Sequence, residues 1–444
     1  MSVLKHLPNA VTRIHKDIFP VLGNGSVIVD KNRKKYLDLT SGIGALSTGH
    51  SHPKVIESVN QQTQLYVHMA QQIFGSHAIQ ETLTEKILST TSYKNLNNIF
   101  YTNSGSEATE NALKIATRYT GKSNIVCIRG GFHGRTIGAL SVTSSNTTCR
   151  KGVRPLLSNI YFCGKETKDE IDEFFSTQCS LEDTAAVIFE SVQGEGGIKS
   201  LSKHYLQYLR NLTQEHGILM IADEVQCGAM RTGDWWNIES KGIRPDMMTF
   251  GKGIASGYQL AGVISSSKIM NNIGQGFLGG TYGGNAISSA ASVATIDILN
   301  EEGVKEHINK MGKLIKDELS DEYIIKEVRQ YGLMIGIEFK HEYNNNEFAL
   351  IYDDNLKKEK KISKKIDSRS LLIFHNKIKK NSFVKITNPV NDKSIIAEVI
   401  SNNVKFSSFY NSVITQRIAD ELSLDPKEPY IDLVLISKNS TFIA

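Results

Sequence analysis

Short apolar segments alternate with helix-like segments between residues 95 and 270, and this alternation constrains the fold more than any other feature. Each apolar segment has the length of one buried strand. Alternation of this kind is typical of βαβ units, which build a mainly parallel sheet. Ligands of such sheets bind at the carboxyl ends of the strands, where the loops leave. The apolar segments are 97–103, 124–130, 185–191, 218–224, 246–253 and 260–266, and the clearest helical ones are 105–120 and 204–217.

The segments that flank this region predict a second, smaller lobe. Residues 26–42 are typical of a β-hairpin, 285–319 of two helices, and 324–340 of two strands joined at a glycine. We therefore expect an α/β fold with a small α+β lobe built from both ends of the central domain. The predicted parts are 1–45 (start of the small lobe), 46–285 (large domain), 286–340 (rest of the small lobe, incomplete), 341–371 (lysine-rich linker) and 372–444 (β-rich tail).

Composition excludes several classes of protein. The 444 residues include 51 Lys+Arg against 46 Asp+Glu, a formal net charge of +5, and 40% of them are hydrophobic, as in a folded globular protein. The five cysteines are widely spaced and contain no Cys-x-x-Cys pair, so we expect neither a disulfide framework nor a metal site. We find no export signal and no span of about 18 apolar residues, and we expect a soluble, cytoplasmic protein without a membrane partner.

Positive charge is concentrated in one segment. Residues 357–385 hold eleven Lys or Arg but only two acids. An anionic partner would explain this run, but a solvated lysine-rich linker explains it more simply. Because the basic residues are local, we expect no nucleic-acid partner.

Two loops after predicted strands offer an amine and a carboxylate. Lys252 lies between two glycines, a setting in which a lone lysine is usually a surface residue. Asp223 ends a buried strand, where its carboxylate needs a cationic or hydrogen-bonding partner. A protonated pyridine nitrogen is such a partner, and the two residues together favour a pyridine cofactor held as a Schiff base.

A strand-to-helix turn and an aromatic residue complete this pattern. The free N–H groups and hydroxyls of Ser104, Gly105 and Ser106 favour a phosphate, although an ordinary serine N-cap explains these residues when they are taken alone. Phe132 offers a face for a planar ring, or simple packing. Together the four parts predict a pocket for pyridoxal 5′-phosphate.

The chain resembles the class III pyridoxal-phosphate aminotransferases of fold type I, and most nearly the 4-aminobutyrate and acetylornithine/ornithine aminotransferases. The resemblance covers about residues 20–340. It rests on eight segments in the family's order: 36–53, 103–116, 130–136, 190–197, 221–233, 250–262, 279–285 and 328–339.

The resemblance implies a role for each matching residue. Lys252 would form the Schiff base and carry the proton, and Asp223 would hold the ring nitrogen charged. The remaining cofactor contacts would be Gly105 and Ser106 at the phosphate, Phe132 and Val225 on the ring faces, Gln226 at the phenolic oxygen, and Thr281 at the phosphate of the neighbouring subunit. The last role implies a homodimer or a higher homo-oligomer.

Substrate contacts are implied in the same way. Arg135 would grip a carboxylate, Ile43 would line the pocket, and Glu190 and Glu195 are the acids of the family motif. Glu195 matches a glutamate that pairs with an arginine of the C-terminal lobe in the family.

The chain departs from the family beyond residue 340. Only Arg369 and Arg417 occur there, neither in the family's setting, and Lys385 in VKITNPV lacks the planar fork of arginine. Residues 375–403 and 412–425 resemble the double-psi barrel domain of rare lipoprotein A-type proteins, although SNNVKFSS stands where that domain has an acidic sequence. A natural fusion, a misjoined frame and a diverged lobe all remain open.

The resemblance implies a transaminase that moves the amino group of an ω-amino acid, 4-aminobutyrate first, to 2-oxoglutarate, giving an aldehyde and glutamate. Acetylornithine or ornithine is the alternative donor. An aminomutase or racemase on the same fold is a second enzyme class. The alternative outside the enzymes is a truncated or fused cofactor-binding protein with little transaminase activity.

Overall fold

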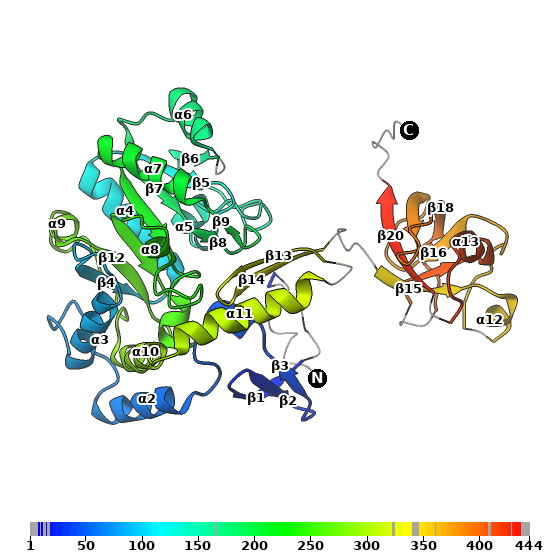
Figure 1. Ribbon diagram of the computed structural model, residues 1–444, viewed down its shortest axis with the longest axis horizontal. Coiled ribbons are helices and arrows are strands. Elements are labelled where there is room, and N and C mark those ends of the chain that lie inside the picture. The colour runs from blue at the N-terminus through cyan, green and yellow to red at the C-terminus, as the bar shows by residue number, and fades with distance from the viewer. Residues whose placement is uncertain are drawn as a thin grey trace. The chain divides into compact units, whose positions relative to one another are not determined.

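The computed structural model describes residues 18–164, 167–321, 325–339, 346–359, 361–406, 410–427 and 429–436, with residues 8, 10, 11 and 15. These residues form two compact units, unit 1 (Met1–Glu338) and unit 2 (Phe339–Ala444). Each unit is described by itself (Figure 1). None of the described helices is both long and apolar enough to cross a membrane.

A seven-stranded sheet forms the centre of unit 1. Its strand order is β4-β12-β11-β10-β7-β5-β6, and only β12 runs antiparallel to its neighbours. The strands are β4 (Asn98–Thr102), β5 (Asn124–Ile128), β6 (Ile160–Cys163), β7 (Thr184–Phe189), β10 (Leu219–Asp223), β11 (Met247–Phe250) and β12 (Ala261–Ser265). The mainly parallel sheet predicted from the alternating segments is therefore confirmed.

The inner strands are apolar because helices cover both faces of the sheet. Every residue of β5, β7 and β10 is buried, as expected for parallel strands without a solvent face. α4 (Gly105–Thr120) packs on β12, β11 and β7 through small side chains such as Ala108, Ala112 and Ala116. α7 (Lys203–Glu215) contacts β10. Figure 1 shows α4 and α7 lying along the sheet.

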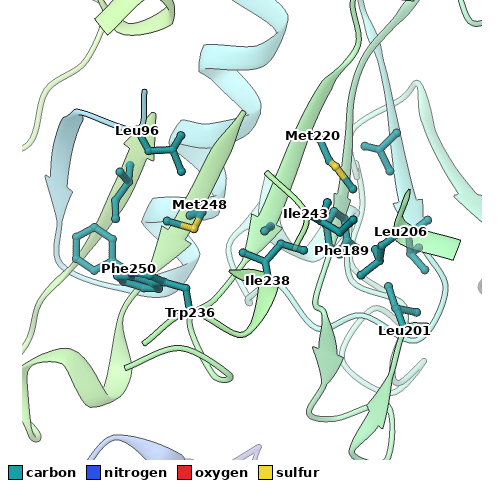
Figure 2. Packing of buried hydrophobic residues seen from close by; sticks show 14 of the residues in the cluster. Leu96, Phe189, Leu201, Leu206, Met220, Trp236, Ile238, Ile243, Met248 and Phe250 are labelled. Atoms are coloured by element: carbon teal, nitrogen blue, oxygen red, sulfur yellow. The ribbon is translucent and has the colours of Figure 1, made fainter. Parts of the chain in front are cut away.

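One large apolar cluster lies between the sheet and the helices on one of its faces, among them α7. Phe250, Trp236 and Met248 lie at one end of the view in Figure 2, and Phe189 and Leu206 at the other. All five side chains are almost completely buried. The core therefore fixes the ends of β7, β10 and β11, from which the loops of the candidate site leave.

The remaining elements of unit 1 surround the central sheet. A three-stranded antiparallel sheet joins β1 (Pro20–Asn24), β2 (Val27–Asp30) and β3 (Lys35–Leu37), which confirms the predicted hairpin. β8 (Val192–Gln193) pairs with β9 (Lys199–Ser200). The other helices are α1 (Ser41–Gly44), α2 (Pro53–Leu65), α3 (Ala78–Ser89), α5 (Ile137–Ser141), α6 (Lys168–Thr177), α8 (Asn237–Ser240), the 3-10 helix η2 (Lys252–Ala255) and α9 (Ser267–Met270).

The predicted helix pair and strand pair are also present. α10 (Ala286–Leu299) packs on α2 and α3, and α11 (Val304–Ser320) packs on β13. β13 (Ile325–Tyr331) and β14 (Met334–Phe339) form a two-stranded sheet, and Gly332 between them has a positive φ of 54°.

Unit 2 is a closed β-barrel with the strand order β15-β19-β16-β18-β17-β20. Its elements are β15 (Asn346–Ile351), α12 (Asp354–Lys358), β16 (Leu372–His375), β17 (Ser382–Thr387), β18 (Ser394–Ser401), β19 (Ser412–Ile414), α13 (Gln416–Glu421) and β20 (Tyr430–Ile436). Apolar side chains that include Ile373, Val384, Val399 and Ile431 fill its interior. The β-rich tail is thus confirmed, whereas the resemblance to a double-psi barrel stays a prediction.

Candidate active site

Loops at the carboxyl ends of β4, β5, β7, β10 and β11 enclose a cavity of about 150 Å³. The lining residues are Ser104, Gly105, Ser106, Phe132, His133, Gly134, Glu190, Asp223, Val225, Gln226 and Lys252. Eight of the predicted site residues are therefore brought together. The arrangement follows from the parallel strands, whose carboxyl ends share one edge of the sheet.

Asp223 is held in place by three hydrogen bonds. Its Oδ1 accepts from Val225 N at 3.1 Å and from Thr249 Oγ1 at 2.8 Å, and its Oδ2 lies 2.6 Å from His133 Nδ1. The side chain is almost fully buried yet lines the cavity. A buried carboxylate aimed at a cavity is suited to bind a cationic or N–H group of a ligand.

His133 is a site residue that the sequence analysis missed. Burial by itself would lower the pKa of its imidazole, but the hydrogen bond to Asp223 and the charges of Asp223 and Glu190 raise that pKa above its usual value. Its Nε2 is buried without a hydrogen-bond partner in the part of the chain that the structure describes. The sequence feature that could have identified His133 is its position directly after Phe132 in the segment GGFHGRT.

Lys252 lies in the left-handed region with a φ of 45°. Burial lowers the pKa of its amine, and the negative charges of Asp223, Glu190 and Glu195 oppose this effect. A Cβ on Gly253 would lie 2.2 Å from Ser47 Oγ, so a larger residue after the lysine would require the Ser47 side chain to move. A buried amine with a lowered pKa is suited to act as a nucleophile or as a proton carrier.

The amino end of α4 faces the same cavity. Ser104 caps this helix, because its side chain accepts from Glu107 N at 3.2 Å, so the N-cap reading of the sequence is correct. The first N–H groups of a helix also form an anion site. A Cβ on Gly105 would lie 2.7 Å from Val225 Cγ1, which explains the glycine at this position.

Glu190 is the buried acid of the site. Its two oxygens accept from Phe132 N at 2.8 Å and from Gly194 N at 3.3 Å. Burial raises the pKa of Glu190 to about 7, helped by the charge of Asp223 and opposed by His133 and the two N–H groups. With a pKa of about 7, the Glu190 carboxyl can be neutral or ionised near neutral pH.

The structure leaves four of the predicted site residues outside the lining of this cavity. Arg135 is exposed, with its guanidinium carbon 5.6 Å from the centre of the Phe132 ring. Ile43 is 67% exposed, and Glu195 is exposed and forms no ion pair with any residue that the structure describes. Thr281 is also exposed, and its implied contact lies in a neighbouring subunit. The roles of these four residues stay predictions.

The family carries an arginine in its C-terminal lobe, and the residues of this chain that could replace it lie in unit 2. Arg417 pairs with Glu421 at 2.7 Å, and Arg369 is within 3.9 Å of Asp367. Lys385 is exposed on β17. Within the described residues, no group of three or more His, Cys, Asp or Glu side chains could hold a metal ion.

Comparison with known proteins gives one consistent result. A family model described as "Aminotransferase class-III" matches residues 9–376. A probable 4-aminobutyrate aminotransferase of Bacillus subtilis is 35% identical over 339 residues, which cover 72% of this chain and 78% of the relative. An acetylornithine aminotransferase of Archaeoglobus fulgidus is 34% identical over 334 residues, covering 75% and 85%. The crystal structure of a transaminase from the marine bacterium Virgibacillus superposes with a TM-score of 0.69 at 28% identity, covering 74% and 80%.

Proposed function

We propose, because this chain belongs to the class-III aminotransferase family, that it moves the amino group of an ω-amino acid to 2-oxoglutarate. The products would be an aldehyde and glutamate. 4-Aminobutyrate is the first donor to test, supported by the relative from Bacillus subtilis. Acetylornithine is the second, supported by the relative from Archaeoglobus fulgidus. The observation that carries the proposal is that Lys252, Asp223 and the amino end of α4 line one cavity.

Enzymes of this family depend on pyridoxal 5′-phosphate, and the residues of the cavity fit this cofactor. The glycine at 105 leaves the first N–H groups of α4 open to a phosphate. Asp223 offers a carboxylate to the ring nitrogen, and Phe132 and Val225 offer faces to the ring. When bound, the cofactor supplies the electron sink for the bonds that break at the amine-bearing carbon of the substrate.

The chain's own residues divide the remaining work. Lys252 attaches the cofactor through Nζ and then moves a proton at the amine-bearing carbon, a task that the lowered pKa of its amine supports. Asp223, held by His133 and Thr249, keeps the ring nitrogen positively charged. Arg135 binds the substrate carboxylate, and Ile43 forms a wall beside it.

The proposed function also has consequences for the assembly of the protein, its location in the cell and the limits of its domains. We propose a cytoplasmic homodimer in which Thr281 of one subunit reaches the cofactor phosphate of the other. This assembly is consistent with the exposed position of Thr281, which leaves its hydroxyl available to a second subunit. We also propose that residues 46–285 form the large domain. The predicted linker 341–371 does not agree with the structure, because β15 lies within it and is a strand of the barrel of unit 2.

The visible absorption spectrum of the purified protein tests the function. The band of the bound cofactor should decrease when 4-aminobutyrate is added and return when 2-oxoglutarate follows. Turnover of the amine without a 2-oxo acid would instead indicate an aminomutase or racemase. A band that none of the tested amines changes would contradict the proposal and would favour a cofactor-binding relative without transaminase activity. The same titration with N-acetylornithine compares the two donors.

A further inference from the structure

Arg231 is a guanidinium without an anionic partner among the described residues. Its one hydrogen bond runs from an Nη atom to Ser41 Oγ at 3.4 Å, and its Nε is buried without a partner in the described part of the chain. Burial lowers the pKa of Arg231. By contrast, Arg210 and Arg329 lie 2.6 Å from carboxylates of Asp246 and Glu338.

A largely desolvated cation without a counter-charge is unfavourable. Such a group is stabilised when an anion completes its hydrogen bonds, and the planar fork of arginine matches the two oxygens of a carboxylate. A carboxylate would offer Arg231 the hydrogen-bond acceptors that the described residues do not supply.

The position of Arg231 connects it to the candidate active site. Its partner Ser41 begins α1, the short turn that carries Ile43, and all four residues of this turn have positive φ. A Cβ placed on Gly253 would lie 3.5 Å from Gly44 O and 3.6 Å from Ala229 Cβ. The turn, the loop that contains Ala229 and the segment after Lys252 thus meet beside the reacting lysine.

We propose that Arg231 binds one carboxylate of the dicarboxylic 2-oxo acid acceptor and of its amino acid product. This inference rests on the proposed transaminase function and deepens it. Arg135 would bind the other carboxylate, so that two guanidinium groups of unit 1 recognise the acceptor. The β-rich tail would then not have to supply the arginine that the family carries in its C-terminal lobe.

Equilibrium binding of glutarate to the cofactor-loaded protein tests this site, because glutarate has two carboxylates but no carbonyl that could react. In Arg231→Met, glutarate should bind about 10- to 100-fold more weakly, as expected for the loss of hydrogen bonds to a charged group. Butyrate, with one carboxylate, should change less than about threefold if it binds at Arg135. Arg244→Met, at an exposed arginine, serves as the matched control and should leave both affinities unchanged.

Two outcomes would overturn the proposal. One is unchanged glutarate binding in Arg231→Met, and the other is an equal loss for glutarate and butyrate, which indicates general damage. Arg231→Lys keeps the charge and the stem, so it should fold even where the methionine variant does not, and its glutarate affinity should be intermediate.

Kinetics separate this proposal from the proposed function. The loss of the cofactor band with 4-aminobutyrate measures the amine half-reaction without any 2-oxo acid. Arg231→Met should keep this step but need about 10- to 100-fold more 2-oxoglutarate. A wild-type protein that reacts with no amine refutes the proposed function, whereas glutarate binding still decides the role of Arg231.

Discussion

Replacing Glu190 by glutamine should stabilise the cofactor-free protein at alkaline pH. The pKa of this carboxyl is about 7 in the folded state, because it is buried, against an ordinary value of 4.5. A carboxyl whose folded pKa is raised contributes stability that is fully present below pH 4.5 and is lost as the pH rises through 7. At about 1.4 kcal/mol for each pH unit between the two values, this loss is on the order of 3 kcal/mol at pH 8.

The glutamine variant removes the ionisation and should recover part of this loss. We expect it to be about 1–3 kcal/mol more stable than wild type at pH 8, since the amide still accepts from one of the two N–H groups, Phe132 N or Gly194 N. At pH 5 the gain should be smaller by on the order of 2 kcal/mol. Urea unfolding followed by tryptophan fluorescence is the assay, because both tryptophans, Trp235 and Trp236, lie in unit 1.

Glu224→Gln provides the matched control. Glu224 is equally buried and its pKa is also raised to about 7 by burial. However, its carboxylate accepts from Asn237 N at 3.0 Å, Ile238 N at 2.7 Å and Cys227 Sγ at 3.2 Å, so the amide loses more hydrogen bonds there. The stability of Glu224→Gln relative to wild type should also rise with pH, but its gain at pH 8 should be smaller or negative. A Glu190→Gln variant whose stability relative to wild type is the same at both pH values would refute the reasoning.

Three further substitutions test the proposed roles. Lys252→Ala should abolish borohydride-dependent attachment of the cofactor, measured as protein mass; a cofactor still fixed to the variant would contradict the assignment. Asp223→Asn should lower turnover by about 100-fold or more while the protein still folds, and an unchanged rate would exclude its role at the ring nitrogen. Arg135→Lys should raise the KM for 4-aminobutyrate by about tenfold with little effect on cofactor affinity, and the reverse order would argue against carboxylate binding.

Much of the central fold could be predicted because its signals are local. A buried parallel strand reads as an uninterrupted apolar run, as in β7 and β10, and the residue that follows such a run lies at the carboxyl edge of the sheet. Asp223 and Lys252 were therefore placed correctly at one edge by their positions after strands, whereas Glu190 was identified through the family motif. The glycine at 105 could be predicted from the turn that begins α4.

The hydrogen-bond network below the cavity could not be predicted in this way. The bond between His133 and Asp223 joins residues 90 positions apart, and no periodicity along the chain relates them. The raised pKa of Glu190 depends on complete burial, which packing of several segments produces. The guanidinium of Arg231, which pairs with no carboxylate among the described residues, could not be predicted either, since a sequence does not show which cations lack an anion.

The closed barrel of unit 2 was only partly predictable for a related reason. Its short β-rich segments indicated strands, but closure depends on pairs that are distant in the chain. β15 pairs with β19 in parallel, over residues 349–351 and 412–414, and β15 also pairs with β20. Pattern along the chain predicts that strands exist, whereas pairing between distant strands decides that they close.

The distribution of site residues separates cofactor chemistry from acceptor recognition. Every residue that lines the cavity falls between positions 104 and 252, all within unit 1. The local structure that holds these residues, from the cap of α4 to the hydrogen bonds of Asp223, also lies in unit 1. The residues proposed to hold the cofactor in this cavity therefore all belong to unit 1. Recognition of the acceptor is the step for which the family uses an arginine of the C-terminal lobe, and Arg231 is the cation through which unit 1 would supply it.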